Sequence, residues 1–139
     1  MTLRFAGYAA LFDAVDRGGD VIRRGAFAHA VEAGAKGLPL LWQHQQSAPI
    51  GRIERIAEDA RGLRVIGRLT PGAKPAIDAA ALLRDGAVGG LSFGYRVRAK
   101  RPRPGGRELT DLDLVEVSLV TFPMQPGARV HAVQEENES

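Results

Sequence analysis

One run of residues, 112–120, constrains the fold more than any other part of the sequence. Its sequence, LDLVEVSLV, carries apolar side chains on both alternating faces, which predicts a strand buried on both sides. The single ionisable residue within 114–120 is Glu116. A buried carboxylate is costly unless it is paired or hydrogen-bonded, so Glu116 either has a partner, for which a histidine would serve, or faces water.

Glycine, proline and aspartate divide the rest of the chain into short β-rich runs. Strands are expected at residues 3–12, 38–42, 50–57, 63–69, 87–97 and 112–120, and a further short strand can follow at 128–133. The five residues 58–62 contain a glycine and predict a hairpin between the third and fourth of these strands. The segments 16–20 and 101–106 are expected to be loops.

Two helices are expected between the strands. A short amphipathic helix at 26–33 ends at Gly34, and a longer one at 74–85 ends at Gly86. The apolar stripe expected on the longer helix contains Ile77, Ala80, Ala81 and, in part, Leu82 and Leu83. Six or seven strands with two inserted helices favour a compact α+β fold, a mainly antiparallel sheet or β-barrel flanked by a few helices, over a doubly wound one. With 139 residues and no internal repeat, the chain is expected to form one domain at 1–133 with an acidic tail at 134–139.

Composition excludes several kinds of site. The chain has no cysteine, which excludes a disulfide framework, a cysteine nucleophile and thiolate metal centres. It has three histidines, too few for a histidine-rich metal centre, so neither a metal nor a cofactor is expected. Aspartates interrupt the first 20 residues, where no long apolar run occurs, and we therefore expect a soluble, cytoplasmic protein without a membrane span.

The formal net charge of +3 is unevenly distributed. Six cationic residues lie close together: Arg96, Arg98, Lys100, Arg101, Arg103 and Arg107. We interpret this run as the solvated tip of a hairpin rather than a nucleic-acid contact, because no aromatic side chain lies within it to stack on bases. Glutamates cluster instead in the expected tail.

The side chains that could carry chemistry are few. Of the four serines, Ser92 lies in a strand among Gly89, Gly90 and Gly94, and small neighbours allow a substrate backbone to approach closely. His44 lies at the end of an apolar strand, where it could serve as a base. Taken singly, each of these two residues is more simply explained as structural.

Several blocks of sequence, in order, resemble the prohead protease family of tailed phages. The blocks are residues 7–12 (GYAALF), 16–22 (DRGGDVI), 25–27 (GAF), 40–44 (LLWQH), 49–52 (PIGR), 62–69 (GLRVIGRL), 90–95 (GLSFGY) and 116–121 (EVSLVT). The resemblance runs from about residue 5 to residue 130. It is more specific than any single block, because the blocks keep their order and spacing.

This resemblance implies a capsid-maturation serine endopeptidase related to the herpesvirus assemblins, with a compact β-barrel flanked by helices. By similarity, His44 is the general base, Ser92 the nucleophile and Glu116 the acidic member, with Asp113 or Asp111 as the alternatives. The implied substrates are scaffold and the scaffold-like N-terminal segment of the major capsid protein, together with the protease itself. The implied location is the interior of the assembling prohead in the host cytoplasm, where the protease could also form a homo-oligomer.

Two other interpretations remain open at this stage. Family members commonly carry an acidic or amide residue directly after the histidine, and Gln45 supplies the uncharged amide there, which would orient the base less strongly than a carboxylate. Relatives can also carry a C-terminal extension. A weakly active or inactive barrel that binds scaffold is therefore the alternative to a protease. A nucleic-acid-binding barrel that uses the cationic run is the third, and it predicts an affinity that falls steeply with salt.

Overall fold

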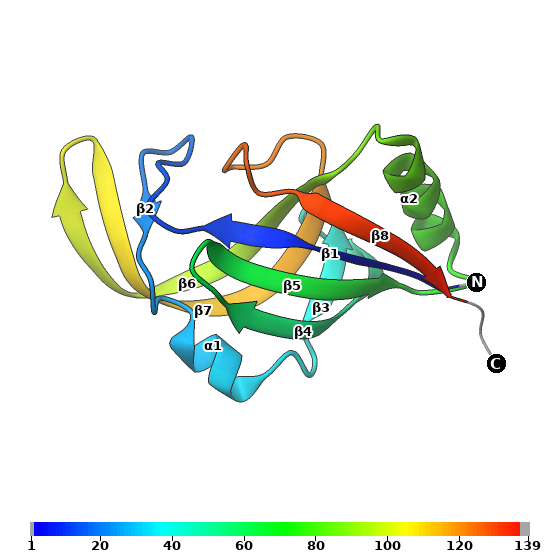
Figure 1. The fold of residues 1–139 in the computed structure, drawn as a ribbon, viewed down its shortest axis with the longest axis horizontal. Coiled ribbons are helices and arrows are strands. Elements are labelled where there is room, and N and C mark those ends of the chain that lie inside the picture. The colour runs from blue at the N-terminus through cyan, green and yellow to red at the C-terminus, as the bar shows by residue number, and fades with distance from the viewer. Residues whose placement is uncertain (1, 137–139) are drawn as a thin grey trace.

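The computed structural model describes residues 2–136, which form a single sheet with two helices (Figure 1). The strands are β1 (Thr2–Leu11), β2 (Val21–Ile22), β3 (Pro39–Trp42), β4 (Gln45–Glu58), β5 (Gly62–Leu69), β6 (Gly90–Arg103), β7 (Gly106–Val120) and β8 (Val130–Glu136). The helices are α1 (Ala28–Ala33) and α2 (Lys74–Asp85). The glycines expected to end the helices, Gly34 and Gly86, follow them directly.

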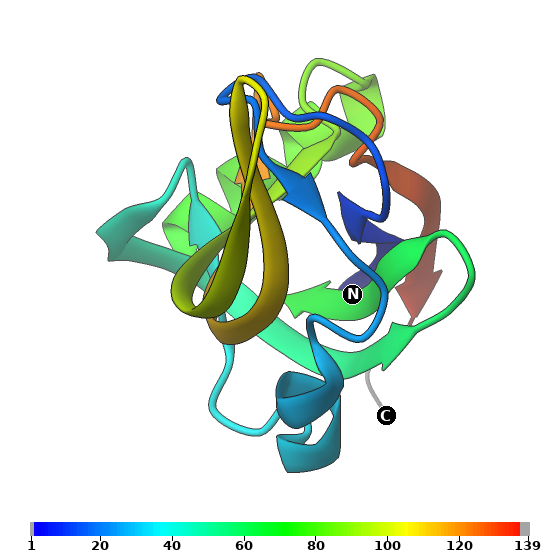
Figure 2. The ribbon, with the colours of Figure 1, turned by 90° about the vertical axis from the view of Figure 1, so that its left-hand side faces the viewer.

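The sheet is mainly antiparallel and strongly curled (Figure 2). Its order is β2-β7-β3-β4-β5-β1-β8, and β6 pairs with the other edge of β7. Only β2 and β3 run parallel to their neighbour β7 among the described strands. An isolated bridge between Gly90 and Arg129 brings the start of β6 to the segment before β8 without closing a continuous ladder. The expected α+β fold is confirmed, and "barrel" describes this open sheet only loosely.

The central strand β7 is buried where the sequence requires it. Residues 116–120 are all buried, and the core around them contains Phe27, Leu40, Leu91 and Leu112. Val115, one residue earlier, is 44% exposed. Burial on both faces is therefore confirmed for the end of β7 that pairs with both β3 and β6, and it does not extend along the whole expected run.

Helix α2 buries a stripe that only partly matches the expected one. Its buried residues are Ala76, Ala79, Ala80 and Leu83, spaced i, i+3, i+4 and i+7, whereas Ile77 is 55% exposed. The expected stripe was correct for Ala80 and Leu83 and wrong for Ile77, Ala81 and Leu82, which are exposed. The three buried alanines give the helix a face of mostly small side chains toward the sheet.

The cationic run forms the tip of a hairpin, as expected, but the turn is shorter than the six-residue loop expected at 101–106. Strands β6 and β7 continue to Arg103 and from Gly106, so that only Pro104 and Gly105 form the turn, which projects beyond the sheet in Figure 1. Gly106 lies against the 16–20 loop, where an added Cβ would overlap the carbonyl oxygen of Gly19. The short strand β2, which the sequence did not reveal, also pairs with this hairpin at Glu108 and Leu109.

The last strand is longer than expected. β8 continues to Glu136, three residues into the segment expected to be an acidic tail. Glu135 forms an ion pair with Arg84, and Glu136 forms one with Arg4, so the acidic residues have local partners. Residues 137–139 of the expected tail lie outside the described residues.

Candidate active site

His44 lies in a two-residue turn between β3 and β4 that has an unusual backbone. Gln43 and His44 both have positive φ, 52° and 59°, as the type I′ hairpin turn requires and as non-glycine residues seldom adopt. The end of β7 holds this turn in place. The Gln43 backbone N–H donates to the carbonyl of Leu119 at 2.9 Å, and the Gln43 side chain donates to Thr121 Oγ1 at 2.7 Å. A strained backbone that persists because its surroundings fix it is typical of functional sites.

The imidazole of His44 is hydrogen-bonded to Glu116. The distance between His44 Nδ1 and Glu116 Oε1 is 2.5 Å, and the side chains are 43% and 10% exposed, respectively. The other carboxylate oxygen, Oε2, accepts a hydrogen bond from the Ser118 hydroxyl at 2.8 Å. Ser118 Oγ in turn accepts one from the backbone N–H of His44 at 3.1 Å. The partner that Glu116 needs in order to be buried is therefore a histidine, one of the two alternatives that the sequence left open.

Glycine at position 94 makes room for this carboxylate. Gly94 lies opposite Glu116 in the β6–β7 ladder, at a register shift between Gly94 and Tyr95. A Cβ added to Gly94 would lie 2.7 Å from Glu116 Oε1 and 3.0 Å from its Cγ. Real Cβ atoms do not approach so closely, so a larger residue at 94 would displace the Glu116 side chain.

Ser92 and His44 line the same small cavity, of about 110 Å³. The other lining residues come from β1, β2, β6 and two loops: Ala9, Asp16, Ile22, Leu91, Phe93, Tyr95, Met124 and Gln125. Ser92 is 8% exposed and lies directly opposite Ser118 in the β6–β7 ladder. Within residues 2–136, the hydrogen bonds of His44 run to Glu116 and Ser118, and none joins it to Ser92.

Hydrogen bonds fix the two loops that border the cavity. The buried side chain of Gln125 accepts from the Leu11 backbone N–H at 2.8 Å and donates to the Leu11 carbonyl at 2.9 Å. Arg17 donates its backbone N–H to the carbonyl of Met124 at 3.1 Å, which ties one loop to the other. These hydrogen bonds fix the positions of the two loops at the edge of the cavity.

An ion pair acts on Tyr95, one of the residues that line the cavity. The guanidinium of Arg107 donates to Asp20 at 2.6 Å and holds the pKa of that carboxyl below its usual value. Burial, and next the charge of Asp20, raise the pKa of Tyr95, so its hydroxyl stays protonated at neutral pH. Tyr95 can therefore contribute a neutral hydrogen-bonding group to the cavity wall.

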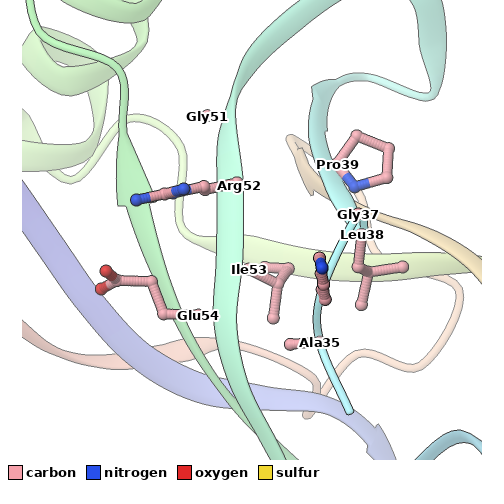
Figure 3. Close-up of a pocket in the computed structure, with 9 residues that line it drawn as sticks. Ala35, Gly37, Leu38, Pro39, Gly51, Arg52, Ile53 and Glu54 are labelled. Carbon is pink, nitrogen blue, oxygen red and sulfur yellow. The ribbon is translucent and has the colours of Figure 1, made fainter. Parts of the chain in front are cut away.

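A larger hollow of about 580 Å³ lies elsewhere, between residues 35–39 and 51–54 (Figure 3). Ile53 points toward Leu38 across it, whereas Arg52 and Glu54 point away. Its lining contains neither a serine nor a histidine. The smaller cavity at Ser92 is therefore the better candidate for an active site.

The structure separates the three candidate acids. Glu116 contacts His44, whereas Asp113 binds Arg98 at 3.1 Å, and Asp111 contacts both Arg98 and His29. In the described part of the chain, no cluster of histidine and acidic side chains is arranged to hold a metal ion. The described helices also include none long and apolar enough to span a membrane.

Sequence reasoning missed two residues of this site, Ser118 and Gly94. Ser118 is two residues from Glu116, so a strand places both side chains on one face. This two-residue spacing was the sequence signal that could have predicted their contact. The role of Gly94 depends on the register of β6 against β7, for which the sequence carries no signal that we can identify.

Comparisons with known proteins agree with the resemblance found in the sequence. The chain is 35% identical over 134 residues to the prohead protease of Enterobacteria phage HK97, covering 94% of this chain and 60% of that protein. It is 31% identical over 105 residues to the capsid polyprotein of Pseudomonas phage PAJU2, covering 70% of this chain and 16% of that protein. The chain thus spans only part of the length of these relatives.

Solved structures share the fold at low sequence identity. The bacteriophage T4 capsid assembly protease matches with a TM-score of 0.70 and 16% identity, over 84% of this chain and 80% of that one. The KSHV protease, solved with a hexapeptide phosphonate inhibitor, matches with a TM-score of 0.69 and 12% identity, over 98% and 66% of the two chains. The expected herpesvirus-protease-like fold is confirmed.

The family comparison covers every residue. The sequence profile of the Caudovirus prohead serine proteases matches residues 1–139. The chain belongs to the Caudovirus prohead serine protease family.

Proposed function

We propose that this chain is a serine endopeptidase in which Ser92 is the nucleophile, His44 the general base and Glu116 the carboxylate that orients and stabilises His44. One observation carries the proposal: a histidine, hydrogen-bonded at 2.5 Å to a buried carboxylate, lines the same cavity as a serine. A nucleophile, a base and a group that holds the base are what hydrolysis by a serine hydroxyl needs. We also infer that the chain acts as one protease domain, which was expected to end at residue 133 and which includes the whole of β8 to Glu136.

The proposed reaction has two halves. Ser92 Oγ attacks the carbonyl carbon of the scissile peptide bond while its proton moves to His44 Nε2, and Glu116 stabilises the imidazolium that forms. The proton then passes to the leaving amine as the C–N bond breaks, which leaves an acyl-enzyme ester on Ser92. Water gives a proton to His44 and attacks the ester, and return of that proton to Ser92 releases the acid and restores the site.

The proposed substrates are capsid proteins. Two relatives support this assignment, one named as a prohead protease and the other as a capsid polyprotein. We infer that the enzyme cleaves scaffold and the scaffold-like N-terminal segment of the major capsid protein, and also itself, inside the assembling prohead in the host cytoplasm.

Co-expression with the major capsid protein tests this function. A tailed-phage major capsid protein is produced with either the wild type or Ser92→Ala, and the intact masses of both products are measured. Trimming by the wild type alone is the expected result, and the new mass locates the cut. Assembled shells with identical, untrimmed masses in both samples would instead support a structural, scaffold-binding role.

Gly94→Ala is expected to slow proteolysis by about 10- to 100-fold, because the added Cβ displaces the Glu116 carboxylate from His44. The matched control is Gly89→Ala, since a Cβ at Gly89 meets no atom within 4 Å. Both variants are compared with the wild type by the initial rate of capsid-protein cleavage. Equal rates for the two variants would contradict the spatial role assigned to Gly94.

A further inference from the structure

We propose that Ser118 is a positioning residue that locks the base and the acid of the site into one geometry. The inference rests on the proposed function, because it assigns Ser118 a role in holding His44 and Glu116. Ser118 touches both residues through one oxygen atom. It is not itself a catalytic residue, because its hydroxyl proton is donated to Glu116 and its side chain does not line the cavity.

The hydrogen bonds of Ser118 close a ring. The Ser118 hydroxyl donates to Glu116 Oε2 at 2.8 Å and accepts from the His44 backbone N–H at 3.1 Å. The other carboxylate oxygen, Oε1, contacts His44 Nδ1 at 2.5 Å. The ring therefore fixes the rotation of the Glu116 carboxylate. It also fixes the position of the His44 imidazole relative to the backbone of His44.

Burial makes this ring difficult to replace with water. Both Ser118 and Glu116 are buried. Without the hydroxyl, an oxygen of a buried carboxylate and a backbone N–H would both lose a partner. The structure would then recover hydrogen bonds by turning Glu116 or by relaxing the turn at His44.

The backbone at His44 is the second reason for this role. Gln43 and His44 both adopt positive φ, and such a turn keeps its shape only when several contacts fix it. Leu119 and Thr121 fix Gln43, whereas Ser118 supplies the hydrogen bond to the backbone of His44. Loss of Ser118 therefore frees the residue that carries the base.

The first test is an NMR measurement that needs no substrate. The ring N–H that His44 donates to Glu116 should give a proton resonance far downfield of the amides, assigned by its absence in His44→Ala. In Ser118→Ala we expect that resonance to broaden or disappear, while the dispersion of the backbone amide resonances shows that the protein is still folded. The control is Val65→Ala, which removes buried methyl groups from β5, and it should keep the resonance. An unchanged resonance in Ser118→Ala would overturn the inference.

The second test is the rate at which a fluorophosphonate labels the serine nucleophile. Ser118→Ala is expected to react about 10- to 100-fold more slowly than the wild type, and Val65→Ala within about twofold of it. If Ser118→Ala does not fold, Ser118→Cys keeps the shape with only a weak S–H donor and should give an intermediate rate.

The two tests separate the failure of this inference from the failure of the proposed function. A wild type whose Ser92 is never labelled would contradict the proposed function, and the ring-proton resonance would still decide whether Ser118 holds His44. Labelling that depends on Ser92, with the same rate and the same resonance in Ser118→Ala, would overturn the role of Ser118 and leave the protease assignment intact.

Discussion

Ser92→Ala is expected to lower kcat for peptide-bond hydrolysis by about 10⁴- to 10⁶-fold, because the other described residues that line the cavity include no serine or threonine to form the acyl-enzyme. A small residual rate would remain from substrate binding and from backbone donors around the cavity. The measurement is the single-turnover rate on a peptide that spans the cleavage site mapped by co-expression. KM should change little, because the hydroxyl is needed for bond formation rather than for binding.

The matched control for this prediction is Ser47→Ala. Ser47 is an exposed serine of β4 and does not line the cavity, so its removal should leave the rate within about twofold of the wild type. A Ser92→Ala protein that still cleaves at the wild-type rate would require another nucleophile.

Glu116→Gln is expected to lower kcat by about 10⁴-fold. Glutamine keeps the length of the side chain but loses the negative charge that stabilises the imidazolium, and its amide can hold the imidazole in the wrong tautomer. The same peptide and the same single-turnover assay measure the effect. In a protein that already carries Ser92→Ala, Glu116→Gln should lower the rate little further, because the effects of substitutions in residues that act as a unit are not additive.

Asp113→Asn is the control for the carboxylate. Asp113 was an alternative acid on the basis of sequence, and its carboxylate binds Arg98 rather than His44. The rate should therefore stay near that of the wild type. A large loss in Asp113→Asn with a normal rate in Glu116→Gln would reverse the assignment.

The sequence was sufficient to predict the pieces of the site that depend on local pattern. His44 follows an apolar run that forms β3, and Glu116 is the ionisable residue in a stretch that forms the buried end of β7. A buried charge requires a partner, so solvation predicts that Glu116 either has a partner or faces water, and a histidine was one group that could serve. The link from these two residues to Ser92 came from the resemblance to a family, because single residues allow structural explanations.

Features that depend on register and on long-range packing were not predictable. Gly94 makes room for the Glu116 side chain only because the two residues lie opposite each other, and the register shift beside Gly94 sets that pairing. Strand β2 is two residues long and exists because the hairpin lies beside it. In α2, the stripe that faces the core consists of three alanines and Leu83, and Ile77 lies outside it. Tertiary contacts, rather than local propensity, decide each of these cases.

The most direct test of the central claim, that Ser92 is a nucleophile activated by His44, is the identification by mass spectrometry of the serine that a fluorophosphonate modifies. The chain has four serines, so peptide mapping distinguishes Ser92 from Ser47, Ser118 and Ser139. We expect one adduct, on Ser92, in the wild type, and its loss in His44→Ala. An adduct on another serine, or equal labelling of Ser92 in His44→Ala, would contradict the account.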